Sequence, residues 1–150
     1  MLAEQVPEGL AERVCPDFGE PELTSPPRVE DRQVAIVSTA GLIHRGDRPF
    51  GLGAVDYRVI DRDDPADLVM THISTDFDRS GFIQDHEVVF PLRRLSELAE
   101  SSEQREIGSV GRFHYSFMGA TDPQAMAPAV KQLAQTLRGD GTNVVLLVPV

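Results

Sequence analysis

The chain has 150 residues, of which 41% are hydrophobic and 25% are charged, and its formal net charge is -10 at pH 7. This length and composition are typical of one globular domain with its own hydrophobic core. The acidic balance argues against nucleic acid or an anionic membrane as a partner, because both bind basic surfaces.

The sequence also shows no membrane-spanning segment, no signal peptide and only one cysteine. No apolar stretch approaches the roughly 20 residues of a membrane-spanning helix, and residues 1–5 lack the basic start of a signal peptide. Cys15 is the single cysteine, so no internal disulfide can form. We therefore expect a cytoplasmic protein without a membrane partner.

Residues 1–30 are expected to form a peripheral N-terminal segment and a linker. Pro7 interrupts the helical spacing of its first apolar residues, and residues 20–28 contain three prolines. The rest of the chain, residues 31–150, is expected to be one domain.

Short apolar runs predict the first strands of that domain. Residues 34–37 are typical of a buried strand, and residues 56–60 alternate polar and apolar side chains, as a half-exposed strand does. Residues 67–72 predict a second buried strand. Residues 42–53 contain Gly and Pro breakers and predict a loop.

The next part of the chain combines polar, helical and aromatic patterns. Residues 74–87 are too acidic to belong to a core, whereas leucines three apart predict a helix that starts at Pro91 and continues through Leu98. Residues 106–119 predict a loop-rich segment with alternating aromatic residues.

The C-terminal pattern is the clearest indication of fold class. Asp122 and Pro123 are typical of a helix start, residues 126–137 continue that helix, and residues 144–148 form a continuous apolar run. Such a run predicts a parallel strand that is buried on both faces. We therefore expect an α/β fold: a layered sheet with mainly parallel strands and flanking helices, forming an incomplete Rossmann-like domain.

Three segments could carry chemistry, and the first follows the strand at 34–37. Thr39, Gly41 and His44 offer a hydroxyl, a close backbone approach and a basic group that could hold a carboxylate or a phosphate. The segment matches neither nucleotide-binding glycine pattern. The alternative is a turn at the end of a strand with solvated side chains.

The second segment contains His72, Asp76 and Asp78, with His86 further along the chain. These side chains could form an acid–base pair or bind a metal, but their spacing is not that of a helical zinc motif. Aspartates also form turns, and His72 could simply accept or donate a structural hydrogen bond with either aspartate. No metal site is therefore predicted.

The third segment is the aromatic stretch around His114, Tyr115 and Ser116, which could form the wall of a small-substrate site. The alternative is a strand on which Tyr115 and its aromatic neighbours occupy one face. His114 and Ser116 would then lie on the opposite, wetter face.

These segments occur in an order that resembles the selenoprotein B family of the glycine, sarcosine, betaine and D-proline reductases. The phrase His-Tyr-Ser-Phe-Met-Gly at 114–119 is the most specific part of the resemblance, which extends from about residue 34 to residue 150. The matching motifs in chain order are residues 71–78, 88–98, 106–110 and 112–119.

The resemblance implies an oxidoreductase subunit that cleaves a C–N bond reductively in a small amino-acid-like substrate. In this family a Sec-x-x-Cys motif directly follows a strand of the type at residues 144–148. Val150 is the last residue here, and selenocysteine is encoded by UGA, so the resemblance implies a chain truncated at its selenocysteine position. The chain itself would hold no cofactor, and selenocysteine would come immediately after Val150.

The resemblance also implies partners and roles. The partners would be a small-molecule substrate and either other reductase subunits or a thiol reductant. We further expect a homo-oligomer, since a terminal apolar strand leaves an unpaired edge. His72 and His114 would be the catalytic residues, as proton donors or substrate ligands beside the selenolate, on one side of the sheet and near Val150. The expected substrate-binding residues are Thr39, Gly41, His44, Asp76, Asp78, Tyr115 and Ser116.

Two other functions remain open at this stage. One is a non-catalytic module that binds a small acid or a partner subunit through the loops at residues 41–46 and 112–119. The other is a metal-dependent hydrolase that uses His72, Asp76, Asp78 and His86.

Overall fold

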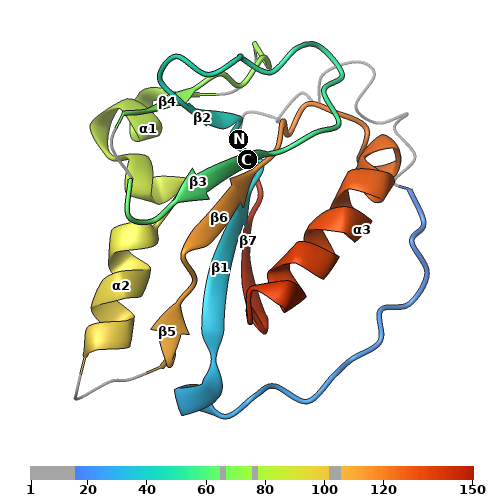
Figure 1. Ribbon diagram of the computed structural model, residues 1–150. Helices are drawn as coiled ribbons and strands as arrows, with labels where there is room; N and C mark the ends of the chain where they lie inside the picture. Colours follow the sequence, from blue (N-terminus) through green and yellow to red (C-terminus); the bar gives the residue numbers. More distant parts are fainter. Residues whose placement is uncertain (1–15, 65–66, 76–77, 102–105) are drawn as a thin grey trace, which may run out of the picture.

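A computed structural model describes residues 16–64, 67–75, 78–101 and 106–150, and they form a mixed α/β fold (Figure 1). Helix α2 (Leu92–Glu100) covers one face of a mostly parallel sheet, and helix α3 (Pro123–Gly139) covers the other face. The predicted α/β class, with mainly parallel strands and flanking helices, is confirmed.

The sheet is built around strand β1 (Gln33–Ser38). Strand β7 (Val144–Val148) pairs with β1 in parallel along one edge. Strands β5 (Ser109–Val110) and β6 (Phe113–Ser116) follow one another in parallel along its other edge. Strand β3 (Arg58–Asp61) pairs with β6 in the antiparallel direction. β1 is therefore the only strand of this sheet paired on both edges by parallel neighbours among the described residues.

A second, two-stranded sheet lies above the ends of the main sheet. It pairs β2 (Leu42–His44) with β4 (Leu68–Met70) in the antiparallel direction. The predicted loop at residues 42–53 is thus wrong at its start, and the buried strand predicted at residues 67–72 is shorter and only partly buried. All three residues of β4 are only partly buried, although Leu68 and Met70 pack against a buried apolar cluster that includes Leu42 of β2.

Helix α2 is preceded by short helical turns. Helix α1 (Ser80–Gln84) and the 3-10 turn η2 (His86–Val88) occupy the segment that was predicted to be polar, and a further 3-10 turn, η1 (Val29–Asp31), leads into β1. The buried Glu87 carboxylate accepts hydrogen bonds from the backbone N–H groups of Arg93 and Arg94. N–H groups in the first turn of a helix have no partner within the helix, so Glu87 stabilises the start of α2 by accepting from these two.

Helix α3 begins where the sequence predicts. The Asp122 carboxylate accepts from the Gln124 N–H at 2.9 Å, and Pro123 occupies the first turn. Met126, Leu133 and Leu137 form its buried face. They pack against Ala35, Tyr115 and Phe117 of the sheet side.

The opposite face of the sheet buries a larger apolar cluster. It is formed mainly by β1, α2 and the segment that precedes α2, which together exclude water from this face of β1. The fully described members of this cluster are Val34, Ile36, Ala40, Leu42, Ile60, Val89, Phe90, Leu92, Leu95, Ile107 and Val110.

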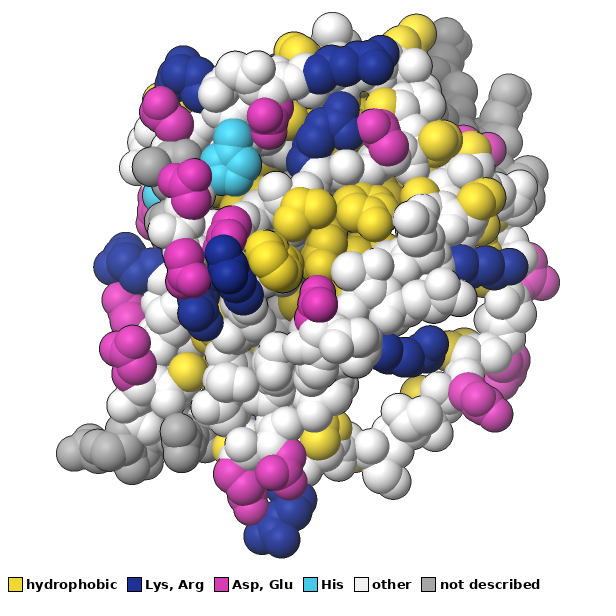
Figure 2. Space-filling model, viewed as in Figure 1, with side chains coloured by type: hydrophobic (Ala, Val, Ile, Leu, Met, Phe, Trp, Pro, Cys, Tyr) yellow, Lys and Arg dark blue, Asp and Glu magenta, His cyan; other side chains and the backbone are white. Residues whose placement is uncertain are grey.

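Strand β7 lies at the edge of the sheet, so the prediction of a strand buried on both faces is wrong. Val145 is 39% exposed and Leu147 is 70% exposed. Both share the face of Ala35, but α3 covers β1 and β6 and leaves this side of β7 open. At the opposite edge Val59 of β3 is also exposed. Figure 2 shows hydrophobic side chains gathered in the middle of one face, surrounded by charged ones.

None of the helices in the described part of the chain combines the length and hydrophobicity needed to cross a bilayer.

The open edge of β7 predicts self-association through this strand. Among the described residues β7 pairs only with β1, so its other edge, beside exposed Val145 and Leu147, is a surface that a second copy could extend. We expect the wild-type chain to form dimers or larger assemblies at rising concentration, and Leu147→Lys to weaken association about tenfold because it places a charge on the edge. Sedimentation velocity over a concentration series measures this.

Leu52→Lys is the matched control, since Leu52 is 94% exposed and lies outside the strands. It should leave the assembly unchanged. A wild-type chain that stays monomeric at the highest concentration contradicts the prediction.

Candidate functional site

Three segments meet at the carboxyl ends of β1, β6 and β7. The Val150 N–H donates to the Thr39 hydroxyl at 2.8 Å, and that hydroxyl donates to the Val150 carbonyl at 3.2 Å. The Gly119 N–H donates to the Thr39 carbonyl at 2.9 Å. Thr39 therefore continues the pairing of β1 beyond its last ladder residue and holds Val150 beside Gly119.

Gly41 brings a fourth segment to the same place. Its φ of +65° turns the chain away from β1, a conformation that favours glycine. Its carbonyl accepts from both the N–H and the hydroxyl of Thr71, each at 2.9 Å. These bonds place the His72 backbone against Gly41. A Cβ on Gly41 would lie 3.0 Å from the backbone nitrogen of His72.

The His72 side chain reaches across to Gly119. A Cβ built on Gly119 would lie 3.1 Å from His72 Nε2, 2.8 Å from the Thr39 carbonyl oxygen and 2.6 Å from the Val150 carbonyl oxygen. Only a residue without a side chain allows this approach. We call the group formed by Thr39, Gly41, His72, Gly119 and Val150 the strand-end cluster.

His72 is a buried imidazole in this cluster. Its Nδ1 accepts from the Ser74 N–H at 3.3 Å, which places the proton of the neutral ring on Nε2. Arg79 donates to the His72 and Ser74 carbonyls. Burial, and then the positive charge of Arg79, hold the pKa of His72 below its ordinary value of 6.5. At neutral pH the ring is therefore uncharged.

His114 is placed differently, in the middle of the sheet. Its Nδ1 accepts from the Ile36 N–H at 2.9 Å, and its ring lies edge-on to Phe90 with centroids 5.8 Å apart. Burial, and then Arg62, lower the pKa of His114 to about 4, and weaker opposing effects of Gly111 and Asp61 do not reverse this. The prediction of a wetter face for His114 is wrong, because the side chain has no exposed surface.

The two histidines are consequently not equivalent. His72 lies beside Gly119 and Val150, as expected for a residue at the carboxyl end of the sheet. His114 bonds to Ile36, three residues or about 10 Å before Thr39 along β1. The structure brings His72 to the strand ends and leaves His114 inside the core, so a catalytic role for His114 stays a prediction without geometric support.

Tyr115 and Ser116 are held by the fold itself. The Ser116 hydroxyl accepts from the Leu42 N–H at 2.8 Å, and Ser116 is fully buried, contrary to the prediction of a wetter face. Tyr115 lies under α3, edge-on to Tyr57 with ring centroids 5.5 Å apart. Burial is the main cause that raises the pKa of Tyr115 to about 12. Contact of either side chain with a substrate stays a prediction.

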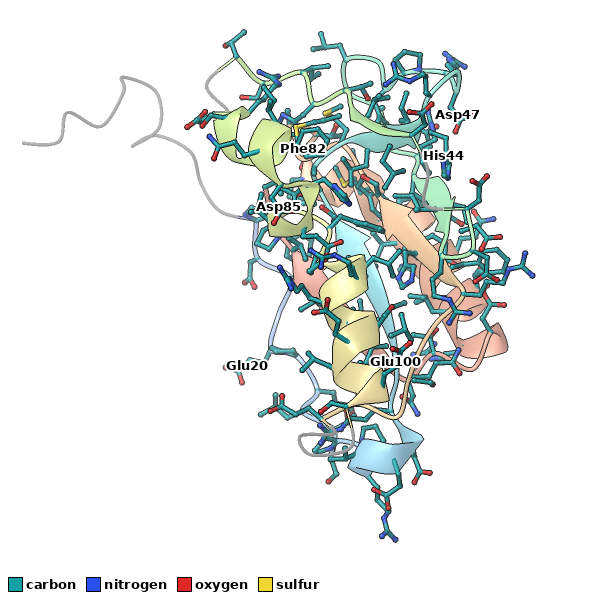
Figure 3. All side chains as sticks on the ribbon, turned by 90° about the vertical axis from the view of Figure 1, so that its left-hand side faces the viewer. Glu20, His44, Asp47, Phe82, Asp85 and Glu100 are labelled. Carbon is teal, nitrogen blue, oxygen red and sulfur yellow. The ribbon has the colours of Figure 1, made fainter. Side chains whose placement is uncertain are left out.

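The remaining predicted residues lie around the small sheet. His44 ends β2 opposite Leu68, partly exposed and in the region of Asp47 in Figure 3. The Asp78 carboxylate accepts from the Ser80 N–H at 2.9 Å, and hydrogen bonding to Ser80 lowers the pKa of Asp78. Asp76 lies outside the described residues.

The metal-dependent alternative finds no support in the described segments. Within them, no group of three or more His, Cys, Asp or Glu side chains is arranged to hold a metal ion. His86, one of the four residues considered, instead lies next to the Glu87 carboxylate, with His86 Nε2 3.6 Å from Glu87 Oε1.

Sequence reasoning missed two residues that shape this site. Gly119 was part of a recognised segment, but its contact with Val150 depends on how β6 and β7 flank β1. Arg79 lies in the polar segment at residues 74–87, and its bonds to the His72 and Ser74 carbonyls depend on tertiary contacts. Only the position of Gly119, directly after an apolar aromatic strand, was a usable signal for close backbone approach.

Comparisons of this chain with protein-family models, with curated proteins and with solved structures give no match.

Close packing at Gly119 predicts the effect of a single methyl group. Gly119→Ala should lower the free energy of unfolding by about 1–3 kcal/mol, because the Cβ meets two backbone oxygens that cannot move independently. Urea denaturation measures the loss. Gly139→Ala is the control, since a Cβ at Gly139 meets no atom within 4 Å. Equal stability of the two variants would refute the packing described for the cluster.

The buried His114 predicts a pH dependence of stability. Its pKa is about 4 in the folded chain and near 6.5 when exposed, so the unfolded chain binds the extra proton between these values. Stability should be at its full value above pH 6.5 and fall by about 3 kcal/mol as the pH drops to 4. Denaturation midpoints across pH 4–8 measure the slope.

His114→Asn tests the assignment, because the asparagine oxygen can still accept from Ile36 while the side chain does not titrate. The slope should shrink to the part contributed by His72, whose pKa is also lowered. An unchanged slope in His114→Asn would show that another group is responsible.

Proposed function

We propose that this chain belongs to a selenol- or thiol-dependent reductase and binds a small amino-acid-like substrate at its strand-end cluster. The observation that carries the proposal is the convergence of Thr39, His72 and Gly119 on Val150. In this proposal the sheet is part of an incomplete Rossmann-like domain of a cytoplasmic homo-oligomer, which also contacts other reductase subunits or a thiol reductant.

The position of the cluster supports the proposal. In α/β sheets, ligands bind at the carboxyl ends of parallel strands, and Thr39, Gly119 and Val150 follow the ends of β1, β6 and β7. The resemblance to the reductase family implies a selenocysteine in the position after Val150. Because both backbone groups of Val150 are bonded to Thr39, a residue in that position would start next to Gly119 and His72.

His72 supplies the acid–base group of the proposed site. The neutral ring carries its proton on Nε2, the atom directed toward Gly119, and the buried setting keeps the ring uncharged at neutral pH. In this form His72 could donate a hydrogen bond to a carboxylate of the substrate, and its protonated, imidazolium form would be needed to transfer a proton to a leaving amine. Selenocysteine, when present, supplies a nucleophile that is ionised at neutral pH.

Gly41 and Thr39 orient the other parts of the site. Gly41 leaves room for His72 by lacking a side chain, and its carbonyl is bonded twice to Thr71. Thr39 fixes the exit direction of the last strand. These contacts position groups without themselves touching the reacting atoms.

Ligand titration followed by amide NMR tests the binding part. Glycine, sarcosine, betaine and D-proline are added separately, and at least one should shift the amides of Gly41 and Gly119. His72→Asn should weaken that binding about tenfold, by removing one hydrogen bond to the ligand. His86→Asn is the matched control: His86 lies beside Glu87, outside the cluster, and this variant should bind normally. Shifts confined to other regions, or none with any of the four compounds, would contradict the proposal.

The redox part has a separate test in the gene. The codon after Val150 should be UGA, followed three codons later by a cysteine codon. A UAA or UAG codon there would remove the support for selenol chemistry. Binding without UGA would instead favour the non-catalytic binding module.

A further inference from the structure

We propose a second small-molecule site, in a pocket beside α2, that binds a carboxylic acid with an apolar body and pairs its carboxylate with Arg62. This site lies outside the strand-end cluster, and it does not depend on the reductase proposal.

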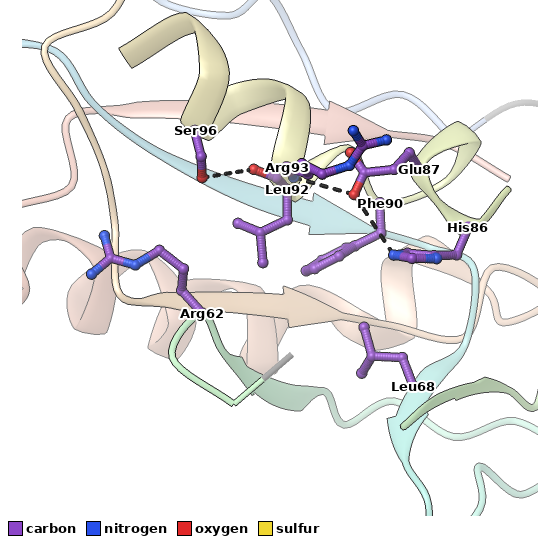
Figure 4. Close-up of a pocket in the computed structure, with 8 residues that line it drawn as sticks. All are labelled: Arg62, Leu68, His86, Glu87, Phe90, Leu92, Arg93 and Ser96. Carbon is purple, nitrogen blue, oxygen red and sulfur yellow. Dashed lines mark hydrogen bonds and ion pairs between the residues drawn. The ribbon is translucent and has the colours of Figure 1, made fainter. Parts of the chain in front are cut away.

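The pocket is large enough for a small organic acid. Its volume is about 490 Å³, within the range of about 300–1,000 Å³ that is usual for ligand sites. Figure 4 shows α2 on one side and Arg62 and Leu68 on the other. The lining residues are Arg62, Leu68, His86, Glu87, Phe90, Leu92, Arg93 and Ser96.

The interior of the pocket is apolar. Phe90 and Leu92 are buried members of the main core cluster, and Leu68 packs against that cluster from β4. Their rigid positions in the core mean that a ligand enters a pocket that is already formed. An aliphatic chain or small ring would gain by leaving water here.

Arg62 supplies a positioned charge at one end. Arg62 Nη1 donates one hydrogen bond to the Val110 carbonyl at 2.8 Å. Arg62 Nε donates to the Asp63 carboxylate at 3.2 Å. The guanidinium has five N–H donors in a fixed plane, so donors on both terminal nitrogens remain for a ligand. Its side chain is 39% exposed, which lets it meet a ligand without first being uncovered.

The acidic groups nearby are directed elsewhere. Both oxygens of Glu87 accept from the amides at the start of α2, and Figure 4 draws Glu87 and Arg62 at opposite ends of the pocket. Asp61 forms a bidentate pair with Arg112, accepting from Nε at Oδ1 and from Nη2 at Oδ2. Asp63 remains the competing anion at Arg62, in a partly solvated pair that contributes little.

The side chains of Ser96 and Arg93, which also line the pocket, already have partners. The Ser96 hydroxyl donates to the Leu92 carbonyl within α2, and Arg93 pairs with Glu97 on the outer surface. With these groups paired, and with His86 beside the Glu87 carboxylate, the pocket offers a ligand an apolar interior with the Arg62 guanidinium at one end. A carboxylate can accept charge-assisted hydrogen bonds from the remaining Arg62 donors, which a cation or a neutral hydrocarbon cannot do.

The test is titration of the full chain with octanoate, followed by isothermal calorimetry and amide NMR. We expect saturable binding that shifts the amides of Leu68 and Leu92. In the wild-type chain 1-octanol should bind about tenfold more weakly, because it has the same apolar body without the charge. This comparison needs no variant and is unaffected by folding defects.

Two variants locate the site. Arg62→Met should weaken octanoate binding about tenfold while leaving 1-octanol binding unchanged. Arg94→Met is the matched control: Arg94 is on α2 and pairs with Glu97, but does not line the pocket, so its affinity for octanoate should stay at the wild-type value.

Three results would overturn the proposal. They are no saturable octanoate binding, equal affinity for octanoate and 1-octanol, and a loss in Arg94→Met as large as in Arg62→Met. Each of these leaves the binding of amino-acid-like compounds at the strand-end cluster unaffected, so the two proposals fail separately.

Discussion

The structure depends on the burial of β1 between two helices and two paired edges. Val34, Ala35 and Ile36 are almost without exposed surface, since α2 and α3 cover opposite faces of this strand. The parallel pairing of β7, β5 and β6 then follows from the hydrogen-bonding groups of β1, which have no access to water and must find partners within the sheet. The place where β1 ends decides where Thr39 and Gly41 meet the rest of the chain.

Several buried polar side chains complete the hydrogen bonding that the strands leave unfinished. The neighbour of β1 is interrupted between β5 and β6, and at this level His114 accepts from the Ile36 N–H. Ser116 does the same for Leu42, and Thr39 bonds both backbone groups of Val150. An unsatisfied buried amide costs about 1–3 kcal/mol. This cost explains why His114 and Ser116, which the sequence suggested as site residues, lie inside the core.

His72 differs from these side chains in where its Nε2 atom lies. Its Nδ1 is occupied by Ser74, but Nε2 faces the point at which the segments after β1, β6 and β7 meet. The small sheet of β2 and β4 is what carries it there, through Gly41 and Thr71. Arg62 lies away from the strand-end cluster, in the pocket beside α2. The apolar interior of that pocket is continuous with the main core. The two proposed sites thus use different layers of one fold.

The sequence by itself determined the α/β class, the helix after Asp122, the helix after Pro91 and the buried strand at β1, because caps and apolar periodicity are local signals. It could not determine that β7 lies at an edge, since a run of Val and Leu is the same whether one face or both are covered. Nor could it separate His72 from His114. Which histidine meets a backbone amide in the core and which reaches the strand ends depends on pairings between residues far apart in the chain, and those only the tertiary structure decided.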